Sequence, residues 1–167
     1  MRRTLVLVAA VAVLLAACGG DEGEPTAGEG QDAQEGAAAT VEVADSDLGE
    51  VLVDGEGNTL YMFVPDEEAN GEPTCYDDCA EAWPAYEAID EPTAGSGADQ
   101  SMLATVERKD GTDQVTYNDL PLYYFSGDEA AGDTNGQGLN EVWWVVSPEG
   151  RPIKGDQGAN GDPYGMG

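Results

Sequence analysis

The chain has 167 residues and carries 34 Asp and Glu against 6 Lys and Arg, with no His, which gives a formal net charge of −28. This excess of acids excludes a nucleic-acid-binding protein that works through a basic face, because almost no cations are present to neutralise phosphates. The absence of His excludes Ser-His-Asp triads, Cys-His dyads, c-type haem attachment and His-ligated zinc or copper.

The N-terminus has the pattern of a secretory signal. Two arginines follow Met1, and an uncharged apolar stretch of 11 residues runs from Leu5 to Leu15. This stretch is too short to span a bilayer, which takes about 20 residues, but it fits the apolar region of a signal peptide. The segment Leu15-Ala16-Ala17-Cys18 that follows resembles the bacterial lipobox. We therefore expect residues 1–17 to be a lipoprotein signal peptide and Cys18 to be lipidated. Ordinary Ala-x-Ala cleavage is the alternative.

Cleavage before Cys18 leaves 150 residues and removes two arginines, so the net charge becomes −30. A diacyl group supplies two chains, which is enough for stable anchoring. The lipid must hold the protein without electrostatic help, because an anionic leaflet repels an acidic chain. We expect an extracytoplasmic protein that is held on the cell membrane through the lipid on Cys18.

The mature chain divides into three parts by composition. Residues 19–40 contain six acids, no base and no apolar side chain larger than Ala, so we expect 18–40 to be an acidic disordered tether. Residues 155–167 are rich in Gly, and we expect a disordered tail. Residues 41–154 hold nearly all the larger apolar side chains outside the signal, and their number suits a single domain.

Most elements of this domain are expected to be strands, because short runs rich in β-branched and aromatic residues alternate with turn signals. The expected strands are 41–43, 51–53, 60–64, 102–108, 115–117, 122–125 and 142–146. The expected turns are 54–58, 110–111 and 147–150. Only 76–83 is expected to be helical, and it ends at Pro84.

An internal repeat relates the two halves of the domain. Leu60 to Asp66 matches Leu122 to Asp128 at an offset of 62 residues. Each half then carries a Trp about twenty residues later, and Trp83 is expected to correspond to Trp144. Two similar β repeats, at about 48–90 and 102–150, are expected to pack face to face around one core. The fold class is therefore mostly β, in a single domain with one short helical turn.

Two copies of Tyr-x-aromatic-x-x-Asp behind a lipobox resemble the bacterial lipoprotein family called "secreted repeat of unknown function". The further motifs that carry the resemblance are Asp54-x-x-Gly57-x-Thr59, Cys75-x-x-x-Cys79, Trp83-Pro84, Asp110-Gly111, Pro121-Leu122-Tyr123 and Gly132-Asp133. The match covers roughly residues 48–148. It implies a fold and a location and brings no established activity.

The two motifs supply the candidate ligand-binding residues, which are Tyr61, Phe63, Asp66, Tyr123, Phe125 and Asp128. On a strand the Tyr and the Phe share a face, and the Asp follows at the strand exit. One interpretation is core packing, with each Asp accepting backbone N–H bonds in the following turn. The other is an aromatic and carboxylate pocket between the two repeats for a small ligand or a cell-wall partner.

Cys75 and Cys79 are the only cysteines besides Cys18. In an oxidising envelope we expect them to form a structural disulfide that pins the helical turn. A redox-active pair is the alternative, although the spacing is not Cys-x-x-Cys and no His or nearby Lys is available to lower a thiol pKa.

Residues 133–138 match the first half of a calcium loop, but position 12 is Trp144 and not a bidentate Glu. A looser calcium site from Asp128, Asp133 and Glu141 is a weak candidate, with a polar hairpin loop as the alternative. No metal or other cofactor is otherwise expected.

No catalytic constellation is recognised, so we expect a non-catalytic binding or interaction module of the cell envelope. Its expected partners are the membrane and an envelope protein or cell-wall component. A redox or electron-transfer accessory lipoprotein is the alternative. The acidic surface is expected to reflect a salt-rich habitat, because salt screens the self-repulsion of such a surface. A cation-binding surface is the competing explanation.

Overall fold

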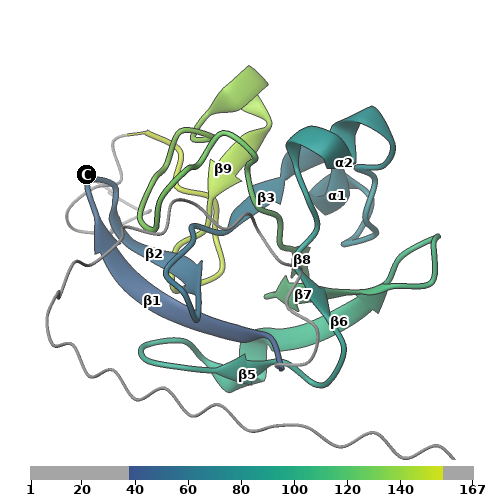
Figure 1. Cartoon of the computed structure of the whole chain (residues 1–167), viewed down its shortest axis with the longest axis horizontal. Coiled ribbons are helices and arrows are strands. Elements are labelled where there is room, and N and C mark those ends of the chain that lie inside the picture. Colours follow the sequence, from purple (N-terminus) through teal and green to yellow (C-terminus); the bar gives the residue numbers. More distant parts are fainter. Residues whose placement is uncertain (1–37, 156–167) are drawn as a thin grey trace, which may run out of the picture. The chain divides into compact units, whose positions relative to one another are not determined.

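A computed structural model describes residues 38–155 (Figure 1). The predicted signal peptide, Cys18, the tether up to residue 37 and the tail from residue 156 lie outside the described residues. The folded domain begins slightly before residue 41, because Ala39 is buried and Thr40 already pairs in the first strand.

Each repeat opens with an antiparallel hairpin. In the first repeat β1 (Thr40–Ser46) pairs with β2 (Gly49–Asp54), and in the second β6 (Leu103–Glu107) pairs with β7 (Asp113–Tyr117). These hairpins confirm the predicted strands in both regions and the turn at 110–111. The equivalent hairpins lie about 62 residues apart, which confirms that the chain contains an internal repeat.

The remaining elements are short. They are β3 (Tyr61–Phe63), α1 (Val64–Glu68), α2 (Asp78–Ala82), β4 (Glu87–Ala88), β5 (Thr93–Ala94), β8 (Leu120–Pro121), β9 (Trp143–Val145) and the 3-10 turns Gln100–Met102 and Leu139–Glu141. Three sheets result, with strand orders β2-β1-β5, β3-β9 and β4-β7-β6, and β8 also pairs with β7. The fold is mostly β, and the longest helices within residues 38–155 have five residues.

Two predicted strands differ from the structure. The strand expected over 60–64 ends at Phe63, because Pro65 supplies the fixed φ of a helix start and Val64 opens α1. The strand expected over 122–125 is not regular. Instead Tyr123 makes isolated bridges to Tyr61 and to Ala85. The predicted helical turn is confirmed as α2, which ends before Pro84.

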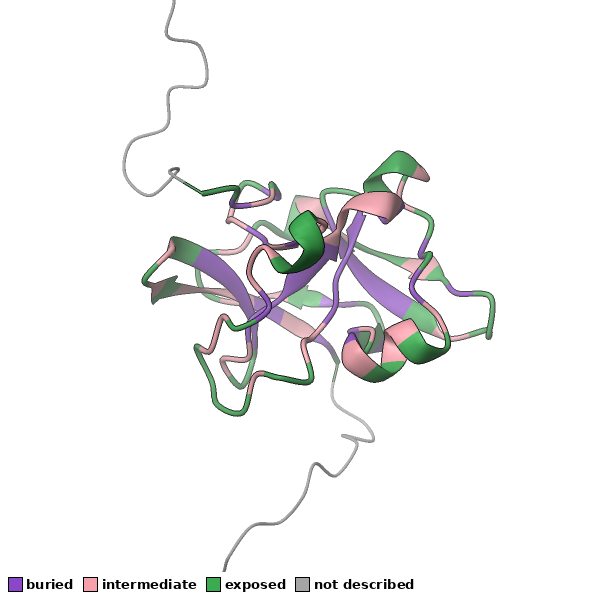
Figure 2. Cartoon of the chain, turned by 90° about the horizontal axis from the view of Figure 1, so that it is seen from above, coloured by how far each residue is buried: buried purple, intermediate pink, exposed green. Residues whose placement is uncertain are grey.

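Figure 2 shows buried residues along the central strands and exposed residues mainly on the loops. Several core side chains, among them Leu60, Trp83 and Leu122, lie outside the strands. One apolar cluster forms around Val41, Leu52 and Val115, and a second around Tyr61, Trp83 and Trp143. Within residues 38–155, no helix has the length and apolar character that crossing a membrane requires.

Candidate functional site

The two repeats exchange strands at Tyr61 and Tyr123. The backbone N–H of each tyrosine donates to the backbone oxygen of the other, and both N···O distances are 2.9 Å. From this bridge, β3 of the first repeat pairs with β9 of the second, while Tyr123 bridges to Ala85 of the first. We expected the two repeats to pack face to face. Instead, strands of one repeat pair with strands of the other, so that expectation is wrong in detail.

The side chains cross between the repeats in the same way. The Tyr61 hydroxyl donates to Asp128 Oδ2 at 2.7 Å, and the Tyr123 hydroxyl donates to Asp66 Oδ2 at 2.6 Å. The second oxygen of each carboxylate accepts bonds from the loop that follows it. Asp66 Oδ1 accepts from the backbone and the hydroxyl of Thr74, and Asp128 Oδ1 accepts from the backbone N–H of Asn135. The Tyr of each motif is therefore hydrogen-bonded to the Asp of the other motif.

Burial shifts the titration of these groups. Desolvation raises the pKa of Asp66 above its usual range, and the hydrogen bonds from Thr74 and Tyr123 oppose that shift. Desolvation, followed by the neighbouring carboxylate, also raises the pKa of Tyr61 and of Tyr123 well above the ordinary tyrosine range. Both phenols are therefore protonated at neutral pH and act as hydrogen-bond donors.

Four aromatic rings form a continuous stack across the two repeats. Trp83 and Trp143 stack at the centre with ring centroids 3.8 Å apart and planes 3° apart. Phe63 stacks on Trp143 at 4.1 Å, and Phe125 lies against Trp83 at 4.4 Å, so each Phe contacts the Trp of the other repeat. The two tryptophans are 5% and 3% exposed, and both Phe rings are half-buried. The stack thus ends in two partly accessible rings.

The ring stack corrects the predicted correspondence of the tryptophans. Trp143, not Trp144, has the role of Trp83 in the second repeat. Tyr61 meets Trp83 edge-on at 5.3 Å, and Tyr123 meets Trp143 edge-on at the same distance. Trp144 belongs to the other apolar cluster, because neighbouring residues on β9 point to opposite faces.

The structure brings the six predicted ligand-binding residues into one assembly. The hydroxyls and carboxylates of four of them make internal hydrogen bonds, and the two Phe rings close the ends of the stack. Asp66 is 0% exposed. These hydrogen bonds and ring contacts hold the two repeats together.

The predicted disulfide between Cys75 and Cys79 is present, with Cα atoms 5.3 Å apart. The backbone N–H of Trp83 donates to the Cys79 oxygen at 2.8 Å, so the bridge lies next to the ring stack. Arg108, which is buried, donates to the Cys75 oxygen at 2.8 Å and lies 4.5 Å from the Tyr76 ring centre. Arg108 thus ties the disulfide loop to β6, a connection that sequence reasoning missed.

The weak calcium candidates are not gathered into a site. Asp128 accepts bonds from Tyr61 and Asn135, while Asp133 accepts the backbone N–H groups of Glu129 and Ala130. Across residues 38–155, no group of three or more Asp, Glu, Cys or His side chains is arranged to hold a metal ion. Asp133 instead has the role of a turn acceptor in the loop after Asp128.

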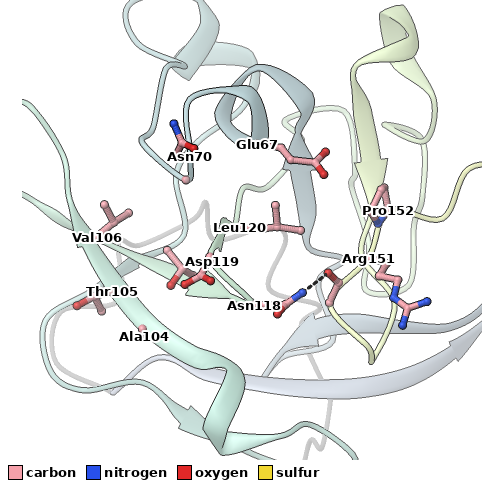
Figure 3. A pocket seen from close by; sticks show the side chains of 13 residues that line it. Glu67, Asn70, Ala104, Thr105, Val106, Asn118, Asp119, Leu120, Arg151 and Pro152 are labelled. Atoms are coloured by element: carbon pink, nitrogen blue, oxygen red, sulfur yellow. Dashed lines mark hydrogen bonds between the residues drawn. The ribbon is translucent and has the colours of Figure 1, made fainter.

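A second candidate region, unforeseen from the sequence, is a groove beside β6 with a volume of about 610 Å³ (Figure 3). Its charged lining residues are Glu67, Asp119 and Arg151, all exposed. The β6 side chains lie on one side of the groove and Arg151 on the other, as Figure 3 shows. This volume lies within the range of about 300–1,000 Å³ that is typical of ligand sites.

The floor of the groove is a tight turn that two neighbouring loops contact closely. Asn118 and Asp119 form the two-residue turn between β7 and β8, with φ of 52° and 63°. The backbones of two loops press on this turn. A Cβ on Gly71 would lie 2.6 Å from the Asp119 oxygen, and one on Gly150 would lie 2.4 Å from the Asn118 Cβ. Asn118 Nδ2 also donates to the Gly150 oxygen at 3.1 Å. Asn and Asp are among the residues that most readily adopt positive φ in such turns, so Asn118-Asp119 could have identified the floor in the sequence.

Comparison with protein families gives one match, to the family described as "secreted repeat of unknown function", over residues 42–86 and 104–147. The two matched segments coincide with the two structural repeats. Comparisons with curated proteins and with solved structures found no match.

Proposed function

Because the chain belongs to the secreted repeat family of unknown function, whose description fits an extracytoplasmic location, we propose that it is a lipid-anchored, non-catalytic interaction module of the cell envelope. The observation that carries this proposal is the separation of two regions. The motif residues are engaged in contacts between the repeats, whereas the groove beside β6 is concave and has exposed charged residues in its lining. A framework whose motif residues are bonded to one another and whose surface is grooved beside β6 suits binding better than chemistry.

The experiment is affinity capture from native envelopes in their natural salt. The mature protein is immobilised through its N-terminus, and retained proteins and wall fragments are compared with those held by a heat-unfolded control. The proposal predicts a component that only the folded protein retains. Equal recovery of the same components by the folded protein and by the heat-unfolded control would count against an interaction module.

Lipid anchoring rests on Leu15-Ala16-Ala17-Cys18. Cys18→Ser is expected to release the protein into the medium or to leave an unprocessed precursor. Mass spectrometry of the mature N-terminus is the direct check, and an unmodified Cys18 there would refute the anchor.

Adaptation to high salt rests on the charge. At about 1 M salt the Debye length falls to about 3 Å, so repulsion between the many carboxylates is screened. The melting temperature is expected to climb between dilute buffer and about 1 M NaCl. An equal rise with micromolar calcium at fixed ionic strength would favour a cation-binding surface instead.

The two Tyr–Asp hydrogen bonds favour a second candidate, a redox accessory lipoprotein. Removal of one electron from Tyr61 or Tyr123 by an oxidised membrane partner would release the phenolic proton to a carboxylate already within 2.7 Å. The visible absorption spectrum of protein purified from its native host separates the two candidates. A tyrosyl-radical band that appears when the protein is oxidised would favour this second role, and its absence would favour the interaction module.

A further inference from the structure

β6 has an unpaired edge. Its hydrogen bonds to β7 begin at Met102, whose oxygen accepts from the Asn118 N–H, and end at Arg108, whose N–H donates to the Thr112 oxygen. Paired groups alternate along an antiparallel ladder, so the N–H and C=O groups of Thr105 and Glu107 and the C=O of Leu103 point away from β7. The Leu103 N–H donates to the Gln100 oxygen in the preceding 3-10 turn. Among the described residues, no strand pairs with that side of β6.

The long strands of the first repeat are covered, and β6 is not. β1 has β2 on one side and β5 on the other, and the far side of β2 receives hydrogen bonds involving Leu60 and Val146. Exposed edges are usually protected by Lys, Pro or a bulge. β6 reads Leu-Ala-Thr-Val-Glu, with Ala104 and Thr105 exposed and its sole charge at Glu107. The centre of this edge is open.

Two grooves flank this edge. The first is the groove of about 610 Å³, which Ala104 and Val106 help to line, and the second, of about 490 Å³, is lined by Leu103 and Pro92 among others. Both reach Ala104 and Thr105. A strand added to β6 would send successive side chains alternately to opposite faces, and so toward one groove and then the other.

The charges around the edge of β6 indicate the charge that a partner segment carries. Five exposed carboxylates line the two grooves against one guanidinium, that of Arg151; they belong to Glu67, Asp119, Asp90, Glu91 and Asp113. A second copy of the chain would bring the same acids. Residues 156–167 carry two acids and no base, so like charges oppose that segment as well. A segment bearing Lys or Arg is complementary on both faces.

We propose that the free edge of β6 binds an extended, Lys- or Arg-bearing segment of a partner protein by strand addition. Backbone hydrogen bonds to Leu103, Thr105 and Glu107 hold the segment, and the carboxylates of the two grooves receive its basic side chains. This inference rests on the proposed interaction function and names the site and the chemistry of the partner.

The probe is the capped peptide Lys-Lys-Val-Val-Lys-Lys-Val, whose paired lysines reach both faces of an added strand. Its length of about seven residues matches one edge strand, and it is titrated into the mature protein. The control peptide has Glu in place of Lys. The Lys peptide is expected to bind, with an affinity that falls as salt rises, and the Glu peptide is expected not to bind. Equal binding of both peptides would overturn the proposal.

Thr105→Pro tests the edge itself. Proline removes an outward N–H that β7 does not use and places its ring in the path of an added strand. Peptide affinity is expected to fall about tenfold or more with an unchanged melting temperature, while the matched Thr105→Val variant binds as the wild type does. Full affinity in folded Thr105→Pro contradicts the proposal, and so does binding that persists unchanged in Asp119→Asn combined with Asp113→Asn.

Amide hydrogen exchange in the wild type gives an answer that does not depend on any variant folding. Peptide binding is expected to slow exchange at Thr105, whose N–H is free, and to change little at Ala104, whose N–H already pairs with β7. Exchange at Thr105 that is slow before any peptide is added, and that speeds up on dilution or on removal of residues 156–167, would assign the edge to a second copy or to that segment instead.

Envelope capture with Thr105→Pro separates this proposal from the broader one. A partner held by the wild type and lost by the variant supports both. A partner held equally by both proteins removes the β6 assignment and leaves the interaction function standing. If the wild type captures nothing, the interaction function fails, and the peptide titration still decides whether the edge binds basic strands.

Discussion

The carboxylates of the two motifs have the same kind of hydrogen-bond partner, a tyrosine hydroxyl, but different surroundings. Asp66 and Asp128 each accept a tyrosine hydroxyl from the other repeat, at 2.6 and 2.7 Å. Asp66 lies on α1 and is fully buried, and desolvation raises its pKa. Asp128 lies in a loop and is half-exposed. An identical motif therefore gives an identical bond but no fixed degree of burial.

The segment between each Asp and its following Trp accounts for the difference. In the first repeat this segment holds α2 and the Cys75–Cys79 disulfide. In the second it is a Gly-rich loop that lies directly on the rings. A Cβ on Gly136 would be 2.7 Å from Trp83 and 2.9 Å from Tyr61, so only glycine fits there without a shift. In both motifs the Tyr–Asp hydrogen bond joins the two repeats. The segment between the Asp and the Trp determines how far that hydrogen bond is shielded from water.

The largest expected effect tests the equivalence of the repeats. Trp83→Ala and Trp143→Ala are each expected to cost about 3–5 kcal/mol of unfolding free energy, the usual penalty for truncating a buried ring. Denaturant unfolding measures both values. Because the two rings stack, the double variant is expected to cost less than the sum of the single variants. If either variant were as stable as the wild type, the ring stack would not be the shared core described above.

Removal of the disulfide in the first repeat is expected to have the next largest effect. In the double variant Cys75→Ala with Cys79→Ala, no disulfide restricts the unfolded chain. The free energy of unfolding is therefore expected to fall by about 2 kcal/mol in the chain-entropy model. The domain is expected to stay folded in high salt, and thermal unfolding with and without reductant checks this. Labelling of both free thiols in the native envelope would show that the bridge does not form there.

The smallest expected effect is a pH dependence specific to Asp66. The folded-state pKa of this carboxyl is raised, so its contribution to stability is complete below the unfolded value of about 4 and is lost as pH rises through the folded value. Relative to Asp66→Asn, the wild type is therefore expected to lose stability from about pH 4 upward. Unfolding measured at several pH values gives the difference.

Asp110 provides a control of opposite sign. Hydrogen bonds from Thr112 lower the pKa of this exposed carboxyl. Relative to Asp110→Asn, the wild type is expected to gain stability as pH rises and to lose it as pH falls through the lowered value. The same slope in both comparisons would mean that overall charge, and not burial of Asp66, governs the pH response.

The sequence was sufficient for features that depend on local pattern. Short runs rich in β-branched residues predicted the hairpins of both repeats, and Pro84 predicted the end of α2. The pairing of Cys75 with Cys79 followed from their being the two cysteines left besides Cys18 in an oxidising compartment. Features that depend on distant pairing were not predictable. The tyrosines reach carboxylates 67 and 57 residues away, and strand alternation alone could not tell which of Trp143 and Trp144 enters the stack. The open edge of β6 exists only because nothing else in the described fold pairs with it.

The central claim is that the two motifs hold the repeats together while binding takes place at β6. Tyr61→Phe combined with Tyr123→Phe removes both crossing hydrogen bonds and keeps the rings. The account predicts that the unfolding free energy falls by about 2 kcal/mol or more, because Asp66 loses a buried donor, while the folded variant binds the Lys peptide with unchanged affinity. Unchanged stability together with lost peptide binding would contradict the account and make the motifs themselves the binding site.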